Sequence, residues 1–308
     1  MDKTKRGIAL FITLLVIASI LSIVAVSFSY LEKVQKDAGE MSAIIQGNLF
    51  YKNTTDILKK FFPKKNTDSK KLDMIYSVPL MISEPKSGFS INLQCEPLMV
   101  AIPIKWLDKT FTKKYPSRFK LARDVLFKVI EKYEIDEANQ LEALILAKVN
   151  GEEDEFIKYE DRLEHKKGIM SKKEFDSMML DYRLRHDDDK VLKIPWEKYF
   201  IFVDVDKETT IDGAYVTAEI ISMAFEIPLE SVEDDWLQKR DIGDSKMTLM
   251  DYLTENSSGE VINKKIFSQK ALNAMHCEER YSYHDRVYSF SFNYLNERSE
   301  NFEFIGEN

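Results

Sequence analysis

The chain has 308 residues, 44% hydrophobic and 31% charged, an apolar content that supports one large domain or two ordinary ones and excludes a disordered chain. Its 10 glycines, 8 prolines and 2 cysteines exclude collagen-like, low-complexity and disulfide-framework proteins. With 52 acidic against 44 basic residues the net charge is -8, which argues against direct nucleic-acid binding because phosphate contacts need Lys and Arg.

The first long segment of the chain is apolar. Residues 8–31 contain no charged side chain, and a helix of that length reaches about 36 Å, enough to cross a hydrocarbon core of about 30 Å. Lys3, Lys5 and Arg6 precede it, so the positive-inside rule places the N-terminus in the cytoplasm and the remainder outside. A cleaved signal peptide is the alternative, but its apolar core runs only about 7–15 residues. We therefore predict a retained transmembrane helix over 8–31.

The helix is predicted to continue past the membrane as an amphipathic helix over 32–62, with its pattern fading at Pro63. Apolar residues recur along it at steps of three and four, with charged residues on the other face; they are Leu31, Val34, Ala38, Met41, Ile45 and Leu49. Six lysines and a single acidic residue then fall within 59–71. These lysines are either a contact site for an anionic partner such as lipid or DNA, or a solvated connector.

The remainder divides into sheet pieces at both ends and mostly helical sequence between them. Alternation predicts strands over 89–95 and 288–294, with 76–83 and 302–304 as their partners, so we assign a sheet domain to 72–105 and 259–308. Helical spacing over 119–133, 138–149 and 214–225, with a short strand over 199–205, predicts a mostly helical inserted domain over 106–258. The fold class is therefore α+β.

One acidic segment suggests a metal site. Asp204, Asp206, Glu208 and Asp212 alternate with other residues near a predicted turn, and hard cations such as calcium bind several oxygens around one point. The EF-hand template fails, because Thr209 stands where Gly is needed. The alternative is a set of ordinary exposed acids, and residues 187–189 form a second acidic cluster.

Cys95 and Cys277 both fall outside the cytoplasm under this topology, where disulfides persist, so they are candidates for a bridge. The alternative is that Cys95 is a buried free thiol on the inward face of its strand. No Walker loop, Gly-x-Ser-x-Gly elbow, His-Glu-x-x-His or Cys-x-x-Cys motif is present, and the four histidines are scattered. We predict no enzymatic activity and no required cofactor, with calcium as the one candidate ligand.

The start of the chain carries a more specific signal. Arg6-Gly7-Ile8-Ala9-Leu10, a short basic leader that ends in Gly and runs directly into an apolar helix, resembles the processing site of type IV pilins and pseudopilins. The resemblance implies that a prepilin peptidase removes residues 1–7 by cutting between Gly7 and Ile8, and that Ile8 is then N-methylated. Most members have Glu at the fifth mature position, which here is Ile12. An aliphatic residue there, and the size of the chain, are similar to the K-type minor pseudopilins of type II secretion systems.

That resemblance implies a fold, partners and a location. The fold is a pilin-like long N-terminal helix, transmembrane and then amphipathic, packed on an antiparallel sheet with a helical insertion. The partners are other minor pseudopilins, the major pseudopilin, the prepilin peptidase and an inner-membrane assembly platform. The protein would sit in the bacterial inner membrane with a periplasmic C-terminal domain, as part of a pseudopilus for protein export or DNA uptake. K-type members also bind calcium. The competing hypothesis is a single-span, membrane-anchored periplasmic binding or accessory protein.

Overall fold

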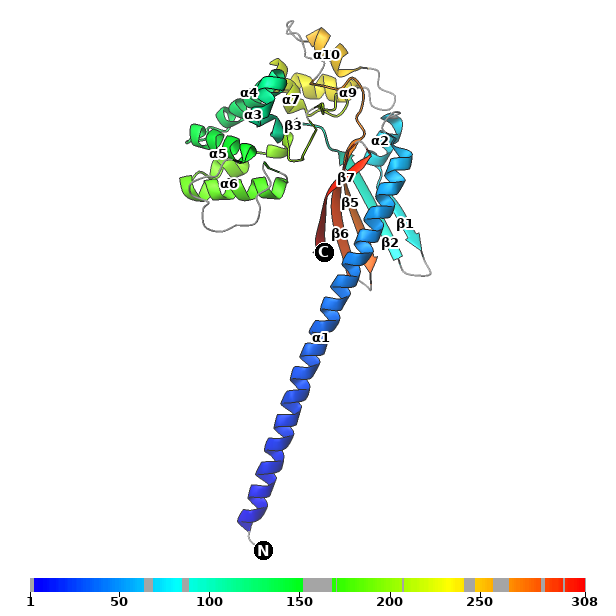
Figure 1. The fold of residues 1–308 in the computed structure, drawn as a ribbon, viewed down its shortest axis with the longest axis vertical. Coiled ribbons are helices and arrows are strands. Elements are labelled where there is room, and N and C mark those ends of the chain that lie inside the picture. The colour runs from blue at the N-terminus through cyan, green and yellow to red at the C-terminus, as the bar shows by residue number, and fades with distance from the viewer. Residues whose placement is uncertain are drawn as a thin grey trace.

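The computed structural model of the chain describes residues 3–63, 69–84, 89–151, 168–169, 171–206, 208–240, 247–256, 266–283, 286–295 and 297–307. The side chains at 3–16 and 18–20 are not described. A single helix, α1 (Lys3–Phe61), extends as a rod from a head that contains the rest of the chain (Figure 1). The upper part of the rod lies along a sheet, and most of the remaining helices form a separate body beside it (Figure 1).

The sheet has five antiparallel strands in the order β1-β2-β5-β6-β7. These are β1 (Leu80–Glu84), β2 (Phe89–Pro97), β5 (Ala274–Tyr283), β6 (Arg286–Leu295) and β7 (Arg298–Glu307). The chain therefore leaves the sheet after β2 and returns at β5, its neighbour, after more than half of its length. Helix α2 (Ser69–Ser77) lies between the end of α1 and β1.

One face of this sheet packs on α1. Tyr288, Phe290, Phe292 and Tyr294 of β6 alternate along that face and are all buried, as the sequence pattern predicts. Tyr51 of α1 packs edge-on against Phe292, with ring centroids 5.2 Å apart. Its hydroxyl donates a 2.8 Å hydrogen bond to Ser299 Oγ of β7. Aromatic burial on this scale is the main term that holds the helix to the sheet.

Gly47 permits the close approach of α1 to β5. A Cβ at this position would lie 2.9 Å from the hydroxyl oxygen of Tyr281, which is buried and donates a hydrogen bond to Ala43 O one turn earlier. A side chain at position 47 would have to displace that ring, so the missing Cβ sets the distance between helix and sheet.

The helical body has its own hydrophobic core, separate from the one under α1. It contains α3 (Lys109–Lys114), α4 (Pro116–Lys132), α5 (Ala138–Asn150), α6 (Lys172–His186), α7 (Ala218–Phe225), α8 (Leu229–Ser231), α9 (Leu237–Lys239) and α10 (Leu249–Asn256). Four further short turns of helix are η1 (Ile104–Leu107), η2 (Asp189–Lys193), η3 (Trp196–Lys198) and η4 (Val232–Trp236), and a two-stranded parallel ladder joins β3 (Ile102–Pro103) to β4 (Phe200–Ile201).

Local sequence explains where these helices begin and end. Asp108, Ser171 and Thr217 cap α3, α6 and α7, each accepting a hydrogen bond from a backbone N–H of the first turn. Pro116 occupies the start of α4, where its missing N–H costs nothing. Helix α5 ends at Gly151 in the left-handed conformation.

The fold is the α+β arrangement predicted from the sequence, a long helix on an antiparallel sheet with a helical insertion, but two local predictions were wrong. Residues 76–83 were assigned to a strand, whereas α2 runs to Ser77 and β1 begins only at Leu80. The strand predicted over 199–205 is reduced to Phe200–Ile201. In addition, Leu98 to Leu107 belong to the core of the helical body and not to the sheet, because the chain turns away from the sheet directly after Pro97.

Candidate functional site

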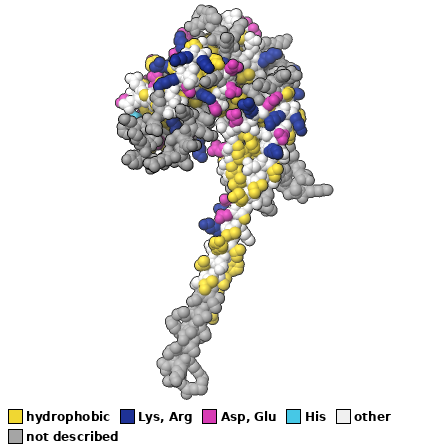
Figure 2. Space-filling model, viewed as in Figure 1, with side chains coloured by type: hydrophobic (Ala, Val, Ile, Leu, Met, Phe, Trp, Pro, Cys, Tyr) yellow, Lys and Arg dark blue, Asp and Glu magenta, His cyan; other side chains and the backbone are white. Residues whose placement is uncertain are grey.

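Helix α1 has a second apolar side, which faces away from the sheet. Val34, Met41, Ile45 and Leu49 are 43%, 60%, 57% and 50% exposed, and at 3.6 residues per turn they fall on one side of the helix. We call these four residues the outer stripe. Figure 2 shows hydrophobic side chains continuing along the rod below the head.

The outer stripe is the pattern that marked this segment as amphipathic, yet the sheet does not cover it. The residues that pack on the sheet lie roughly opposite and include Ala43, Phe50, Thr54 and Leu58. From Ala43 to Leu49 helix α1 is therefore apolar on two sides, and the outer stripe lacks a partner within the described part of the chain. Four large apolar side chains exposed in a row are the usual mark of an interaction surface.

The processing and membrane residues lie at the other end of α1. Gly7, Ile8 and Ile12 fall within the helix, but their side chains are outside the described residues, as is half of the predicted span over 8–31. Among the residues described, no helix combines the length and the apolar character that crossing a bilayer requires.

Cys95 and Cys277 form a disulfide. They are direct cross-strand partners in the antiparallel ladder of β2 and β5, with their Cα atoms 4.1 Å apart. Both are buried on the face that packs on α1. The two cysteines are 182 residues apart in the sequence, on the strands before and after the helical insertion, so the bond links the two ends of that insertion.

Above the disulfide, Asp212 ties three chain segments together. Its backbone N–H donates to Met99 O at 2.8 Å, just after β2. Its carboxylate oxygens accept from the backbone N–H groups of Ala214 at 2.8 Å and of Leu272, just before β5, at 2.7 Å. Burial raises the pKa of this carboxyl to about 7, although these backbone donors act in the opposite direction. Asp212 thus joins the helical body to both strands that lead into it.

The contacts of Asp212 form what we call the joint between the helical body and the sheet. The next residue, Gly213, is constrained by the same joint. Gly213 N donates to Ser268 Oγ at 2.9 Å, and a Cβ at position 213 would lie 2.1 Å from the carbonyl oxygen of Ser268. Only glycine fits where two backbones come this close.

The four predicted calcium ligands do not come together. Asp204 is exposed and pairs with Lys105, Asp206 and Glu208 are exposed, and Asp212 is buried in the joint. Throughout the described residues, no three His, Cys, Asp or Glu side chains gather around a point that could hold a metal ion. The second acidic cluster has structural roles, because Asp188 caps η2 and Asp189 pairs with Arg183 at 2.5 Å. Calcium binding by the four acids stays a prediction.

A second buried carboxyl, which no sequence pattern indicates, lies between α1 and the sheet. Glu279 of β5 is fully buried and accepts a hydrogen bond from Thr54 on α1. Its other oxygen, Oε1, has no hydrogen-bond partner among the described residues. Burial raises the pKa of Glu279 to about 7.

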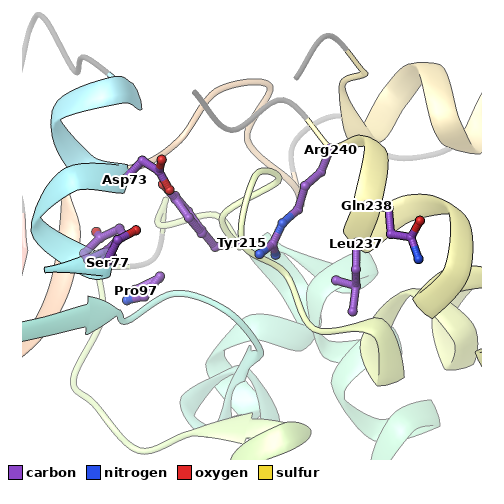
Figure 3. Close-up of a pocket in the computed structure, with 8 residues that line it drawn as sticks. Asp73, Ser77, Pro97, Tyr215, Leu237, Gln238 and Arg240 are labelled. Carbon is purple, nitrogen blue, oxygen red and sulfur yellow. The ribbon is translucent and has the colours of Figure 1, made fainter. Parts of the chain in front are cut away.

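A polar cleft of about 360 Å³ opens between α2 and α9, where the sheet meets the helical body. Figure 3 shows Asp73 on one wall, Arg240 on the other and Tyr215 between them. The Arg240 guanidinium lies 5.7 Å from the centre of the Tyr215 ring, and burial lowers the pKa of Arg240. This arrangement is an electrostatic contact across the joint, without the nucleophile and oriented base that acyl or phosphoryl transfer would need.

Comparisons with known proteins add the following. No family model and no curated protein matches the sequence. Among solved structures, a chain from the GspK-GspI-GspJ complex of the type 2 secretion system of enterotoxigenic Escherichia coli is similar to this chain, with a TM-score of 0.46 and 10% identity. The superposition covers 87% of this chain and 97% of that chain.

Proposed function

We propose that this chain is a minor, non-enzymatic subunit of a pilin-like filament in the bacterial periplasm, anchored by α1 in the inner membrane. In its finer form, the proposal is a minor pseudopilin that primes or caps a short pseudopilus for protein export or DNA uptake. Its partners would then be other minor pseudopilins, the major pseudopilin, the assembly platform and the prepilin peptidase that cuts between Gly7 and Ile8.

The observation that carries the proposal is the outer stripe. A membrane-anchored protein acting alone needs one apolar side on the helix segment outside the bilayer, to pack on its own head. Here the outer stripe, Val34 to Leu49, remains exposed, and its upper part lies opposite the side that packs on the sheet. Helices that bundle in the core of a filament bury such a side against their neighbours. The Gly7–Ile8 boundary supports the same class independently.

Ile12 favours a position at the end of the filament. A buried carboxylate at that position would need a partner, and in pilins the partner is taken to be the N-terminal amine of a neighbouring subunit. An isoleucine cannot make this pair, so the chain is poorly suited to joining beneath another subunit and well suited to being first. A head containing the whole helical body would also obstruct regular stacking in a shaft.

The test is a photo-crosslinking residue placed at Ile45 in cells, with Phe127 on α4, 59% exposed, as the control position. Crosslinks from position 45, and not from 127, to other pilin-like chains are the expected result. The N-terminal mass of the same sample should correspond to a chain that begins at a methylated Ile8. A chain that keeps residues 1–7 and gives no such crosslinks would instead be an anchored accessory protein.

A further inference from the structure

A second exposed apolar surface lies in the head, away from the outer stripe. It is formed where α2 meets β1, and we call it the α2–β1 corner; its residues are Met74, Val78, Leu80 and Met81, which are 60%, 56%, 38% and 77% exposed. The opposite side of α2 supplies Leu72 and Ile75 to the core beneath α1. Packing within the head therefore accounts for one side of α2 and leaves Met74 exposed on the other, together with Lys70 and Lys71.

The corner continues into an open sheet edge. Strand β1 pairs with β2 only, and in the described part of the chain no strand lies beyond it, on the side of the sheet away from the helical body (Figure 1). The outward backbone N–H and C=O groups of an edge strand can pair with a further strand, and proteins commonly protect such edges with inward-pointing charges or a covering helix. Neither Leu80 nor Met81 provides that protection.

The surroundings of the corner are basic, although the whole chain is acidic. Lys59 and Lys60 at the end of α1, and Lys70 and Lys71 at the start of α2, are all exposed. The two helix ends are packed together, because Leu58 and Leu72 share one core. Lys59 lies 3.8 Å from Asp56, and both side chains of that pair are about half exposed, so water screens their attraction. A partner with acidic side chains would complement this rim.

We propose that the α2–β1 corner is a docking surface for an extended, acidic segment of a partner polypeptide, which adds to β1 as a further strand. Backbone pairing with β1 supplies the register, apolar side chains of the segment cover Met74 and Met81, and its acidic side chains meet the lysines. These four exposed lysines thus act on a protein partner through a local surface, not on nucleic acid.

A second copy of this chain does not fit the corner. Antiparallel pairing of β1 with β1 would relate two copies by a two-fold axis and point their α1 helices in opposite directions. Copies anchored in one membrane cannot adopt that arrangement. This exclusion rests on the proposed function, which places α1 in the membrane. Self-pairing would also bring two basic rims together. The occupant is therefore a different, acidic chain.

The experiment uses the full chain in detergent and fluorescent peptides of alternating Glu and Val as the probe, with alternating Lys and Val as the matched peptide. Anisotropy should show saturable binding of the Glu/Val peptide, weakened by salt, and little binding of the Lys/Val peptide. Met81→Glu, and separately Lys70→Glu with Lys71→Glu, should each weaken binding about tenfold or more. Phe127→Glu, at an exposed apolar position on α4, should leave it unchanged.

A Glu/Val peptide that is N-methylated at alternate amides keeps its charges but cannot complete a strand ladder, and it should fail to bind. Strand addition is overturned if this peptide binds as well as the parent. The docking surface as a whole is overturned if the Glu/Val peptide does not bind, if the Lys/Val peptide binds equally, or if Met81→Glu has no effect. None of these results depends on filament assembly, so they are separate from the crosslinking test at Ile45.

Discussion

The hydroxyl of Thr54 on α1 donates a 2.7 Å hydrogen bond to Glu279 Oε2 on β5, inside the interface between the helix and the sheet. This is a polar contact in a layer that is otherwise largely aromatic and aliphatic. Because Glu279 Oε1 has no partner among the described residues, the carboxyl is better accommodated with a proton than without one.

Glu279→Gln should therefore stabilise the protein at neutral and alkaline pH. Burial raises the pKa of Glu279 from 4.5 to about 7, so between those values the folded state binds more protons than the unfolded state. The contribution of this group to the free energy of unfolding is then largest below pH 4.5 and falls as the pH rises to about 7. Glutamine never ionises, so from acid to alkaline pH the variant should gain about 3 kcal/mol relative to the wild type.

Urea denaturation of both proteins at pH 4.5 and pH 8 measures this difference. Glu278→Gln is the control, because Glu278 lies on the other face of β5 and pairs with Arg280 near the surface; its effect should stay within about 0.5 kcal/mol. A stability gain from Glu279→Gln that is equal at the two pH values would contradict the raised pKa of Glu279.

Asp212→Asn should destabilise the protein at acid pH, although the pKa of Asp212 is also raised to about 7. Each carboxylate oxygen accepts a backbone N–H, one from Ala214 and one from Leu272. An asparagine has only one acceptor oxygen, so its amide nitrogen would face one of these donors. The unpaired N–H should cost about 1–3 kcal/mol at acid pH, and the cost should shrink as the pH rises toward 7, because only the wild type loses stability when its carboxyl ionises. The free energy of unfolding from urea curves checks this, and an Asn variant as stable as the wild type at pH 4 would show that these backbone bonds matter little.

Removal of the disulfide should destabilise the head, but the reduced Cys95 and Cys277 should not react with a thiol reagent while the protein stays folded. The bond between Cys95 and Cys277 closes a segment of 182 residues, so Cys95→Ala with Cys277→Ala should lower the free energy of unfolding by about 2–4 kcal/mol. Both sulfurs are buried, so a thiol-specific reagent should modify the reduced protein only after unfolding. Rapid modification of the native reduced chain would mean that β2 and β5 separate without the bond.

The sequence predicts β6 well and misses β5, for a physical reason. Aromatic residues from Tyr288 to Tyr294 alternate with small polar ones, which is the pattern of a strand with one buried face. In β5, the buried face carries Glu279, and its neighbours Glu278 and Arg280 on the other face are also charged. A charged residue on the inward face hides the alternation, so a central strand looks like a polar segment.

The candidate sites also differ in how far a local sequence pattern can predict them. The apolar steps from Val34 to Leu49 are local, and the sequence shows them, but which side of α1 the sheet covers depends on Gly47 and Tyr281, which are far apart in the chain. The sequence groups Asp212 with Asp204 because they are close along the chain. The structure separates them because Asp212 is held by Met99 and Leu272, contacts that no local pattern contains.

Substitutions two residues apart on α1 should separate the roles of its two sides. Gly47→Leu should destabilise the protein by about 1–3 kcal/mol, because the leucine side chain would have to displace Tyr281 from its hydrogen bond with Ala43. Leucine is a good helix former, so the loss would not come from helix propensity. Ile45→Glu should change stability little, because position 45 is 57% exposed and glutamate also favours helix. If the outer stripe binds neighbouring subunits, Ile45→Glu should nevertheless abolish co-purification with other pilin-like chains, since assembly would bury an unpaired carboxylate. Thermal unfolding and co-purification from cells are measured on the same two variants. A stable Ile45→Glu protein that still assembles would show that the outer stripe is not the surface that joins subunits.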